Sequence, residues 1–228
     1  MTNGQEQAYE LACQQPASRN IEELCRKTGA QAVDSSKITV EYLDQAYLVT
    51  LPNGEVSSWN NDEEVPLKDK ILLLHYLVST RSTPASNRLI TFKQLPGCAS
   101  YFRVFSQMAL KPFLDHFGEE PLLLINAGAN LGGHKAGYGD VSITINALPR
   151  VPISFVLWRD DDEFSPRGSI IFDSSSSDFL STEDIRDICV KYPVEVNQKL
   201  TLSNTMASKG SCGTLMLFLR KPLVLAKA

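Results

Sequence analysis

The chain has 228 residues, a hydrophobic content of 43% and a formal net charge of −4. This length and apolar content fit one domain with an ordinary core, so we expect residues 1–228 to form a single domain. The lysines and arginines are dispersed, which argues against a nucleic-acid-binding protein, because such a protein concentrates positive charge on one face. The polar N-terminus lacks the apolar centre of a signal peptide, and no apolar run approaches the roughly 20 residues that span a bilayer. We therefore expect a cytoplasmic protein without a membrane span.

Five cysteines are widely spaced along the chain, and no CxxC pair occurs: Cys13, Cys25, Cys98, Cys189 and Cys212. An odd number at such spacing argues against a disulfide framework, a zinc knuckle and a locally encoded iron–sulfur site. We expect reduced thiols that serve as small packing residues.

Two short helices are predicted at the start of the chain, over residues 5–14 and 21–27. Asn20 and Glu23 have the spacing of a capping box for the second helix, and Gly29 is placed to end it. A β meander should follow, with strands at 37–43, 46–51 and around Val56, because these segments alternate apolar and polar residues and are separated by turn residues.

The middle of the chain is predicted to be mainly helical. The segment 70–79 is apolar nearly all round, which indicates a buried helix, and Asp69 is placed to cap it. The segment 100–117 has aromatic residues at helical spacing, and Pro112 should kink or split this helix. Residues 122–129 fit a helix or a strand equally well.

Strands are predicted again further along, at 141–145, 153–158 and 169–172. Ser181 and Asp184 form a second capping box, which predicts a helix over residues 182–189. This order of elements favours an α+β fold, with one antiparallel sheet built from both strand-rich regions and helices packed on one face.

A run of four acidic residues follows Trp158 directly. Strand alternation would place Asp160 and Asp162 on one side of a hairpin, and Asp161 and Glu163 on the other. Paired carboxylates can bind a hard cation or share a proton, and the indole can form an aromatic wall for a planar ligand. The alternative is a solvated turn that pairs with a nearby arginine, beside a tryptophan that closes the core.

The glycine-rich segment 131–140 is the second candidate for a ligand site. Its glycines, Gly133 among them, permit close approach of a ligand to the backbone, and His134 and Lys135 can meet an anion or a metal. Asp140 ends the segment. The spacing matches neither a P-loop nor a dinucleotide fingerprint, and an exposed loop histidine without a ligand is the alternative.

Two further polar positions are explained by folding. His75 lies within the apolar helix and is expected to be a hydrogen-bonded core residue. Asp173 and the serines after it have the pattern of a turn at a strand end, where short polar side chains satisfy free backbone groups.

A set of scattered short motifs resembles the DUF 3786 family, a family of domains of unknown function found mainly in anaerobic bacteria and archaea. The motifs are His75-Tyr76-Leu77, Phe92, Leu95-Pro96-Gly97, Tyr101, Gly139-Asp140, Ala147-Leu148-Pro149, Trp158, Asp162-Glu163-Phe164, Phe172-Asp173 and Leu180-Ser181-Thr182-Glu183-Asp184. The resemblance covers about residues 71–189, with the helices and β meander of residues 1–60 before it and a divergent tail, 190–228, after it.

The resemblance implies an anaerobe and a cytoplasmic setting beside corrinoid or one-carbon enzymes. Some members carry an N-terminal iron–sulfur domain, but the sequence shows no cysteine cluster, so we do not expect an iron–sulfur role to carry over. The resemblance supplies no catalytic residues, and the sequence assigns no cofactor and no metal.

The leading prediction is a non-catalytic ligand-binding or accessory protein that partners a redox or corrinoid system. Its candidate ligand-binding residues are Trp158, Asp160, Asp162, Glu163, Gly133, His134, Lys135 and Asp140. One alternative is a hydrolase or isomerase with Asp162 or Glu163 as general base. Another is a protein-interaction module that uses the acidic edge and the apolar C-terminal tail.

Overall fold

The structure, a computed structural model, describes residues 3–16, 20–60, 63–79, 83–159 and 165–192. The helices are α1 (Asn3–Gln14), α2 (Ile21–Thr28), α3 (Leu67–Leu77), α4 (Phe102–Phe105), α5 (Lys111–Phe117), α6 (Pro121–Ala129), α7 (Ser176–Phe179) and a last helix at residues 182–192. The strands are β1 (Gln31–Ala32), β2 (Lys37–Tyr42), β3 (Gln45–Thr50), β4 (Glu55–Ser58), β5 (Leu89–Thr91), β6 (His134–Lys135), β7 (Val141–Leu148), β8 (Val151–Trp158) and β9 (Arg167–Asp173).

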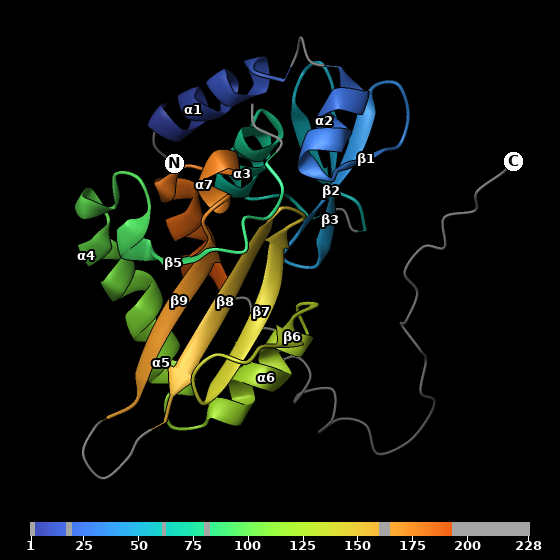
Figure 1. Cartoon of the computed structure of the whole chain (residues 1–228). Helices are drawn as coiled ribbons and strands as arrows, with labels where there is room; N and C mark the ends of the chain where they lie inside the picture. The colour runs from blue at the N-terminus through green and yellow to red at the C-terminus, as the bar shows by residue number, and fades with distance from the viewer. Residues whose placement is uncertain (1–2, 17–19, 61–62, 80–82, 160–164, 193–228) are drawn as a thin grey trace, which may run out of the picture.

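The strands form two antiparallel sheets, which confirms the α+β fold class (Figure 1). The first sheet has the order β1-β2-β3-β4 and the second the order β5-β9-β8-β7-β6. The expectation that both strand-rich regions build one sheet is wrong. Leu43 and Asp44 have positive φ angles of 49° and 63°, so they form a two-residue hairpin loop that returns the chain from β2 directly into β3. In the described part of the chain, no helix is long and apolar enough to cross a bilayer.

Asn20 and Gly29 begin and end α2 as predicted, and the Glu23 carboxylate forms an ion pair with Lys27 Nζ at 2.6 Å. The Asn20 side chain accepts hydrogen bonds from the backbone N–H groups of Glu22 at 2.8 Å and Glu23 at 3.4 Å, and α2 begins at the next residue. Gly29 ends α2 with a φ of 77°. A left-handed backbone at this position favours glycine, which explains why the helix stops here.

The predicted cap of α3 is wrong. This helix begins at Leu67, directly after Pro66, so Asp69 lies inside the first turn. The Asp69 side chain is 8% exposed, and it accepts a hydrogen bond from Lys191 Nζ at 2.7 Å. Asp69 therefore joins α3 to the last helix.

The amphipathic segment around Pro112 is irregular, as predicted. A π-helical turn, η3 (Ser106–Leu110), separates α4 from α5, and Pro112 is the second residue of α5. A proline has no N–H to continue the helical ladder, so a change of helix type just before it has a physical cause. Residues 121–129, which the sequence left open, form the helix α6 with Pro121 at its start.

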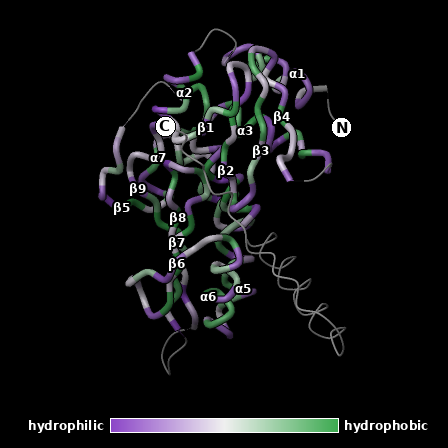
Figure 2. Tube along the Cα trace, turned by 90° about the vertical axis from the view of Figure 1, so that its right-hand side faces the viewer, coloured by the Kyte–Doolittle hydropathy of each residue, from purple (hydrophilic) through white to green (hydrophobic). Residues whose placement is uncertain are grey.

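One face of the second sheet is covered by helices. Apolar side chains of the two central strands point to this face, namely Ile143, Ile145, Ile153 and Phe155. The ring of Phe113 on α5 lies 5.4 Å from that of Phe155, and Tyr192 of the last helix stacks on the same ring at 3.9 Å. Figure 1 shows α5 and α6 behind the long strands, and the side view of Figure 2 separates these two helices from the strands. Of the helices that the structure describes, none lies on the opposite face, which we call the open face (Figure 1).

The two halves of the molecule meet at Tyr76. This side chain is fully buried; its hydroxyl donates to the carbonyl oxygen of Thr28 and accepts the backbone N–H of Arg150 at 3.1 Å. Next to this contact, a Cβ at Gly29 would lie 2.9 Å from Pro149 Cβ, so the C-terminal end of α2 packs closely against the turn between β7 and β8. Tyr76 thus links α3, α2 and the second sheet.

The substitution Tyr76→Phe should lower the free energy of unfolding by about 1–3 kcal/mol, because it leaves the buried carbonyl of Thr28 and the partly buried N–H of Arg150 without their partner. Urea denaturation of the full chain measures this loss. The matched control is Tyr138→Phe, since Tyr138 is 39% exposed; it should change stability by less than about 0.5 kcal/mol. Equal stability of Tyr76→Phe and the wild type would contradict the role given to this hydroxyl.

Candidate functional site

The open face of the second sheet carries a groove of about 500 Å³, which we call the sheet groove. Three of its residues stand side by side on neighbouring strands, because His134 on β6 pairs with Thr144 on β7, and Thr144 pairs with Ser154 on β8. Directly opposed residues of an antiparallel pair point to the same face. The groove is lined by residues 134–138, Ala85, Asn87, Leu89, Thr144, Pro152, Ser154 and Asp173.

Two hydroxyl groups form the floor of the groove. Thr144 Oγ1 and Ser154 Oγ lie 2.7 Å apart, and either one can be the donor. Ser154 is 5% exposed, so its hydroxyl would be costly without a partner. Because one hydroxyl donates to the other, the pair still offers a hydrogen and lone pairs to a ligand above it.

The segment after β6 forms one wall. The Ala136 N–H donates to the carbonyl oxygen of Ser142, and the Tyr138 N–H donates to Ser142 Oγ, both at 3.0 Å. Ser142 is fully buried on the groove side of β7. These two bonds hold the glycine-rich segment across the sheet and position His134 and Lys135 at the groove.

Asp173 holds the opposite wall. Its carboxylate accepts the N–H and hydroxyl of Ser86 at 3.0 and 2.7 Å and the N–H of Asn87 at 2.8 Å. It also accepts the N–H and hydroxyl of Ser175 at 2.9 and 2.6 Å. Burial would raise the pKa of Asp173, but the bonds from Ser175 and Ser86 outweigh it and lower the pKa to about 2. The strand-end turn expected here is confirmed, and its carboxylate is fully engaged in folding.

The charge at the groove is asymmetric. Lys135 is exposed and has no ion-pair partner within the described ranges, so its charge is available to a ligand. His134 shares the sheet face of Thr144, whereas Lys135 is opposed to Ile143 on the other face and reaches the lining of the groove at the edge of the strand. Among the described lining residues, the one carboxylate is that of Asp173, which stays ionised and accepts five hydrogen bonds at the far wall of the groove. The wall at β6 can therefore bind an oxyanion group, while the floor offers hydroxyls.

The structure separates the other predicted ligand residues from the groove. A Cβ at Gly133 would lie 2.8 Å from the Gly128 oxygen and from Ile145 Cγ2, so this glycine serves the packing of β6 on the sheet. Asp140 accepts the Arg159 N–H at 2.8 Å, which joins the start of β7 to the end of β8. Trp158 is 38% exposed and lies four residues beyond Ser154 on the same strand face, about 13 Å away at strand spacing. Asp160, Asp162 and Glu163 lie outside the described residues.

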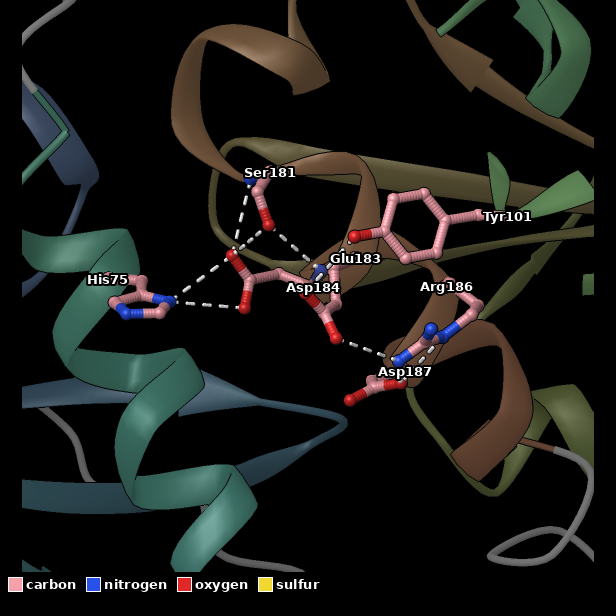
Figure 3. Close-up of polar contacts among 7 residues, drawn as sticks. All are labelled: His75, Tyr101, Ser181, Glu183, Asp184, Arg186 and Asp187. Atoms are coloured by element: carbon pink, nitrogen blue, oxygen red, sulfur yellow. Dashed lines mark hydrogen bonds and ion pairs between the residues drawn. The ribbon is translucent and has the colours of Figure 1, made fainter. Parts of the chain in front are cut away.

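A second polar arrangement lies between α3 and the last helix (Figure 3). His75 Nδ1 is 3.1 Å from Asp184 Oδ1 and 3.3 Å from Oδ2. Asp184 Oδ2 also accepts the hydroxyl of Ser181 at 2.7 Å and its N–H at 3.2 Å, while the Asp184 N–H donates to Ser181 Oγ at 3.1 Å. The predicted capping box is thus confirmed, and its carboxylate also holds a histidine from another helix.

An arginine organises the charges beside this pair. Arg186 donates to Asp187 Oδ1 at 2.6 and 2.9 Å and to Glu183 Oε1 at 3.4 Å. Its guanidinium lies 5.4 Å from the centre of the Tyr101 ring, and the Tyr101 hydroxyl is 3.5 Å from Glu183 Oε2. Figure 3 shows these groups on the side of Asp184 that faces away from His75.

The environment favours the charged form of His75. The hydrogen bond to Asp184 raises the pKa of His75, burial opposes this, and the negative charges of Asp184 and Glu183 add to the increase. The imidazole is 38% exposed and the Asp184 side chain 12%, so solvent screens part of the attraction.

The His75–Asp184 pair should make stability depend on pH. A raised pKa in the folded state means that the contribution is fully present below the unfolded value of about 6.5 and is lost as the pH rises through the folded pKa. The difference in unfolding free energy between the wild type and His75→Gln should therefore be larger at pH 6 than at pH 8.5. Urea denaturation at a series of pH values measures it. A difference that is constant, or that grows with pH, would contradict the pairing.

Sequence reasoning missed two features of these arrangements. His75 was expected to be hydrogen-bonded and Asp184 to cap a helix, but no local pattern indicates that these residues, 109 positions apart, meet each other. The hydroxyl floor was also missed. The alternation of Ser142 and Thr144 with isoleucines on β7 could have indicated a polar face.

Among the residues that the structure describes, no group of three or more His, Cys, Asp or Glu side chains is arranged to hold a metal ion. Cys13, Cys25, Cys98 and Cys189 are free thiols, and burial raises the pKa of Cys25 and of Cys189. Cys212 lies beyond the described part of the chain.

A family model with the description "Domain of unknown function (DUF3786)" matches residues 20–191. The match begins well before residue 71, where the resemblance was expected to start, so it includes the first sheet as well as the sheet groove and the His75–Asp184 pair. No curated protein and no solved structure matches the chain. The chain belongs to the DUF3786 family of domains of unknown function.

Proposed function

We propose that this protein is a non-catalytic binding or accessory protein that holds a small oxyanion-bearing molecule in the sheet groove. The observation that carries the proposal is the row of His134, Thr144 and Ser154 on one face of the sheet, with the exposed Lys135 at the edge of the same groove. Polar groups that converge on a concave surface are typical of ligand sites.

The dimensions of the groove support a small ligand. Its volume of about 500 Å³ lies within the range of about 300–1,000 Å³ that small-molecule sites occupy. His134 and Ser154 are two strands apart, which is about 10 Å at normal strand spacing. A molecule with a carboxylate or phosphate at the β6 wall and hydroxyls over the floor fits these dimensions and charges.

The finer parts of the expected function remain predictions. A redox or corrinoid partner and a cytoplasmic location derive from the family resemblance and from the composition. The hydrolase or isomerase alternative depends on Asp162 and Glu163, and the interaction-module alternative depends on the acidic run and the C-terminal tail. These segments lie outside the described residues.

The ligand class can be tested by calorimetric titration of the full chain with inorganic phosphate, succinate and neutral glycerol. We expect binding of phosphate or succinate and none of glycerol. Lys135→Gln should weaken the observed binding by about 10–100-fold, because a charge-assisted hydrogen bond contributes about 1.5–3 kcal/mol. Thr144→Val keeps the volume but removes the hydroxyl, and about a 5–10-fold loss is expected.

Lys37→Gln is the matched control. Lys37 lies on β2 of the first sheet, whereas the groove lies on the second sheet. The substitution removes the same charge from the protein as Lys135→Gln does. It should leave the affinity unchanged. The proposal would be wrong if neither anion binds, or if Lys37→Gln and Lys135→Gln weaken binding equally, because a general charge effect would then explain it.

A further inference from the structure

The sheet groove is longer than a single oxyanion group needs. One wall carries His134 on β6, and the far wall carries Asp173 on β9 and Leu89 on β5. Figure 1 shows β5 and β6 at opposite edges of the second sheet. Three strand spacings, about 14 Å, separate β6 from β9 in the strand order. A phosphate group held at the β6 wall therefore leaves the far end of the groove to another part of the same ligand.

The far end of the groove presents an amide. Asn87 is exposed and lines the groove, and its backbone N–H donates to Asp173 Oδ2 at 2.8 Å, which fixes the residue at this wall. Within the part of the chain that the structure describes, the Asn87 side chain makes no hydrogen bond. A carboxamide offers a donor and an acceptor side by side, and this pair matches the N6 and N7 atoms of adenine.

Apolar surface accompanies the amide. Leu89 is 43% exposed, and its pairing with Asp173 places it beside the carboxylate that anchors Asn87. Pro152 is half-buried and lies two residues before Ser154, so it points to the same face of the sheet. One exposed leucine alone needs no explanation, but Leu89 and Pro152 line the same groove as the amide. A flat ring can lie against these side chains while its edge meets Asn87.

The charges distinguish the two ends of the groove. Lys135 provides a positive charge at the β6 edge, whereas Asp173 stays ionised at the far wall. A second anionic group near Asp173 would be repelled. Between the two ends, the hydroxyls of Thr144 and Ser154 form the floor. The groove therefore fits a ligand with one anionic end, hydroxyl groups in the middle and a neutral ring at the other end.

We propose that the sheet groove binds a nucleoside monophosphate. The phosphate lies at the β6 wall and the ribose hydroxyls lie over Thr144 and Ser154. The base, adenine or another with an adjacent donor and acceptor, pairs with the Asn87 amide and packs on Leu89 and Pro152. This inference rests on the proposed oxyanion site and names the kind of molecule that carries the oxyanion. Binding is reversible, and no covalent bond forms or breaks.

The test is calorimetric titration of the full chain with AMP, ribose 5-phosphate and adenosine. We expect one AMP to bind per chain. Ribose 5-phosphate lacks the base and should bind about 5–100-fold more weakly, which is the range for one amide–base pair. Adenosine lacks the phosphate and should bind about 10–100-fold more weakly, because the charge-assisted hydrogen bonds are lost. Lys135→Gln should weaken AMP and ribose 5-phosphate by the same factor and leave adenosine unchanged.

The variant Asn87→Gly removes the amide and preserves the wall. The φ angle of Asn87 is 55°, which glycine adopts freely, and the backbone N–H to Asp173 is kept. The affinity for AMP should fall to near that for ribose 5-phosphate, and the affinity for ribose 5-phosphate should not change. Asn60→Gly is the matched control, since Asn60 is an exposed residue that follows β4 of the first sheet. It should leave all three affinities unchanged.

A second variant tests the apolar contact and does not depend on how Asn87→Gly folds. Leu89→Ala should weaken AMP about 3–10-fold, because it removes part of the apolar surface that the base covers, and it should not affect ribose 5-phosphate. Its control is Leu122→Ala, since Leu122 is an exposed leucine of α6 on the helical side of the sheet. This control should leave the affinity for AMP unchanged.

The outcomes separate this inference from the proposed function. If ribose 5-phosphate binds through Lys135 but AMP binds no more tightly, the nucleotide assignment fails and the oxyanion site stands. If none of the three compounds binds, or if AMP and adenosine bind equally, both fail. If neither Asn87→Gly nor Leu89→Ala weakens AMP, the base lies elsewhere and the assignment is overturned.

Discussion

The alternation of side chains along β7 and β8 is the constraint on which the rest of the structure depends. Isoleucines and Phe155 point to one face, where α5, α6 and the last helix bury them. Ser142, Thr144 and Ser154 must then point to the other face. Because the helices bury only one face, these polar residues lie side by side on the other face. The segment that follows β6 and the segment that precedes β5 form the two walls beside them. The sheet groove is thus a consequence of how the core forms.

The same core also brings together His75 on α3 and Asp184 on the last helix. Tyr76 fixes α3 against α2 and the turn between β7 and β8, and Tyr192 stacks on Phe155 to hold the last helix against the sheet. Because both helices are anchored to one sheet, His75 and Asp184 meet although they are far apart in the chain. A capping carboxylate, needed only to start a helix, thereby also orients an imidazole.

Local signals in the sequence predicted most of the elements and few of the contacts. Asn20, Gly29 and the Ser181–Asp184 box act within a few residues, so their effects could be read directly. The β2–β3 hairpin was predicted, but no local pattern indicates that the two strand-rich regions form separate sheets instead of pairing with each other. Asp69 looked like a cap because its long-range partner Lys191 was unknown. Of the predicted ligand residues, His134 and Lys135 line the groove, whereas Gly133 and Asp140 support its framework.

The central claim is that the open face of the second sheet is the ligand-binding face of this protein. Two-dimensional ¹⁵N–¹H NMR spectra of the full chain, recorded during a phosphate titration, test it most directly. The account predicts shifts concentrated on the amides of residues 134–138 and of Thr144 and Ser154, with the amides of α5 and α6 unchanged. Shifts that are absent from these residues, or that centre on the helical face, would contradict it.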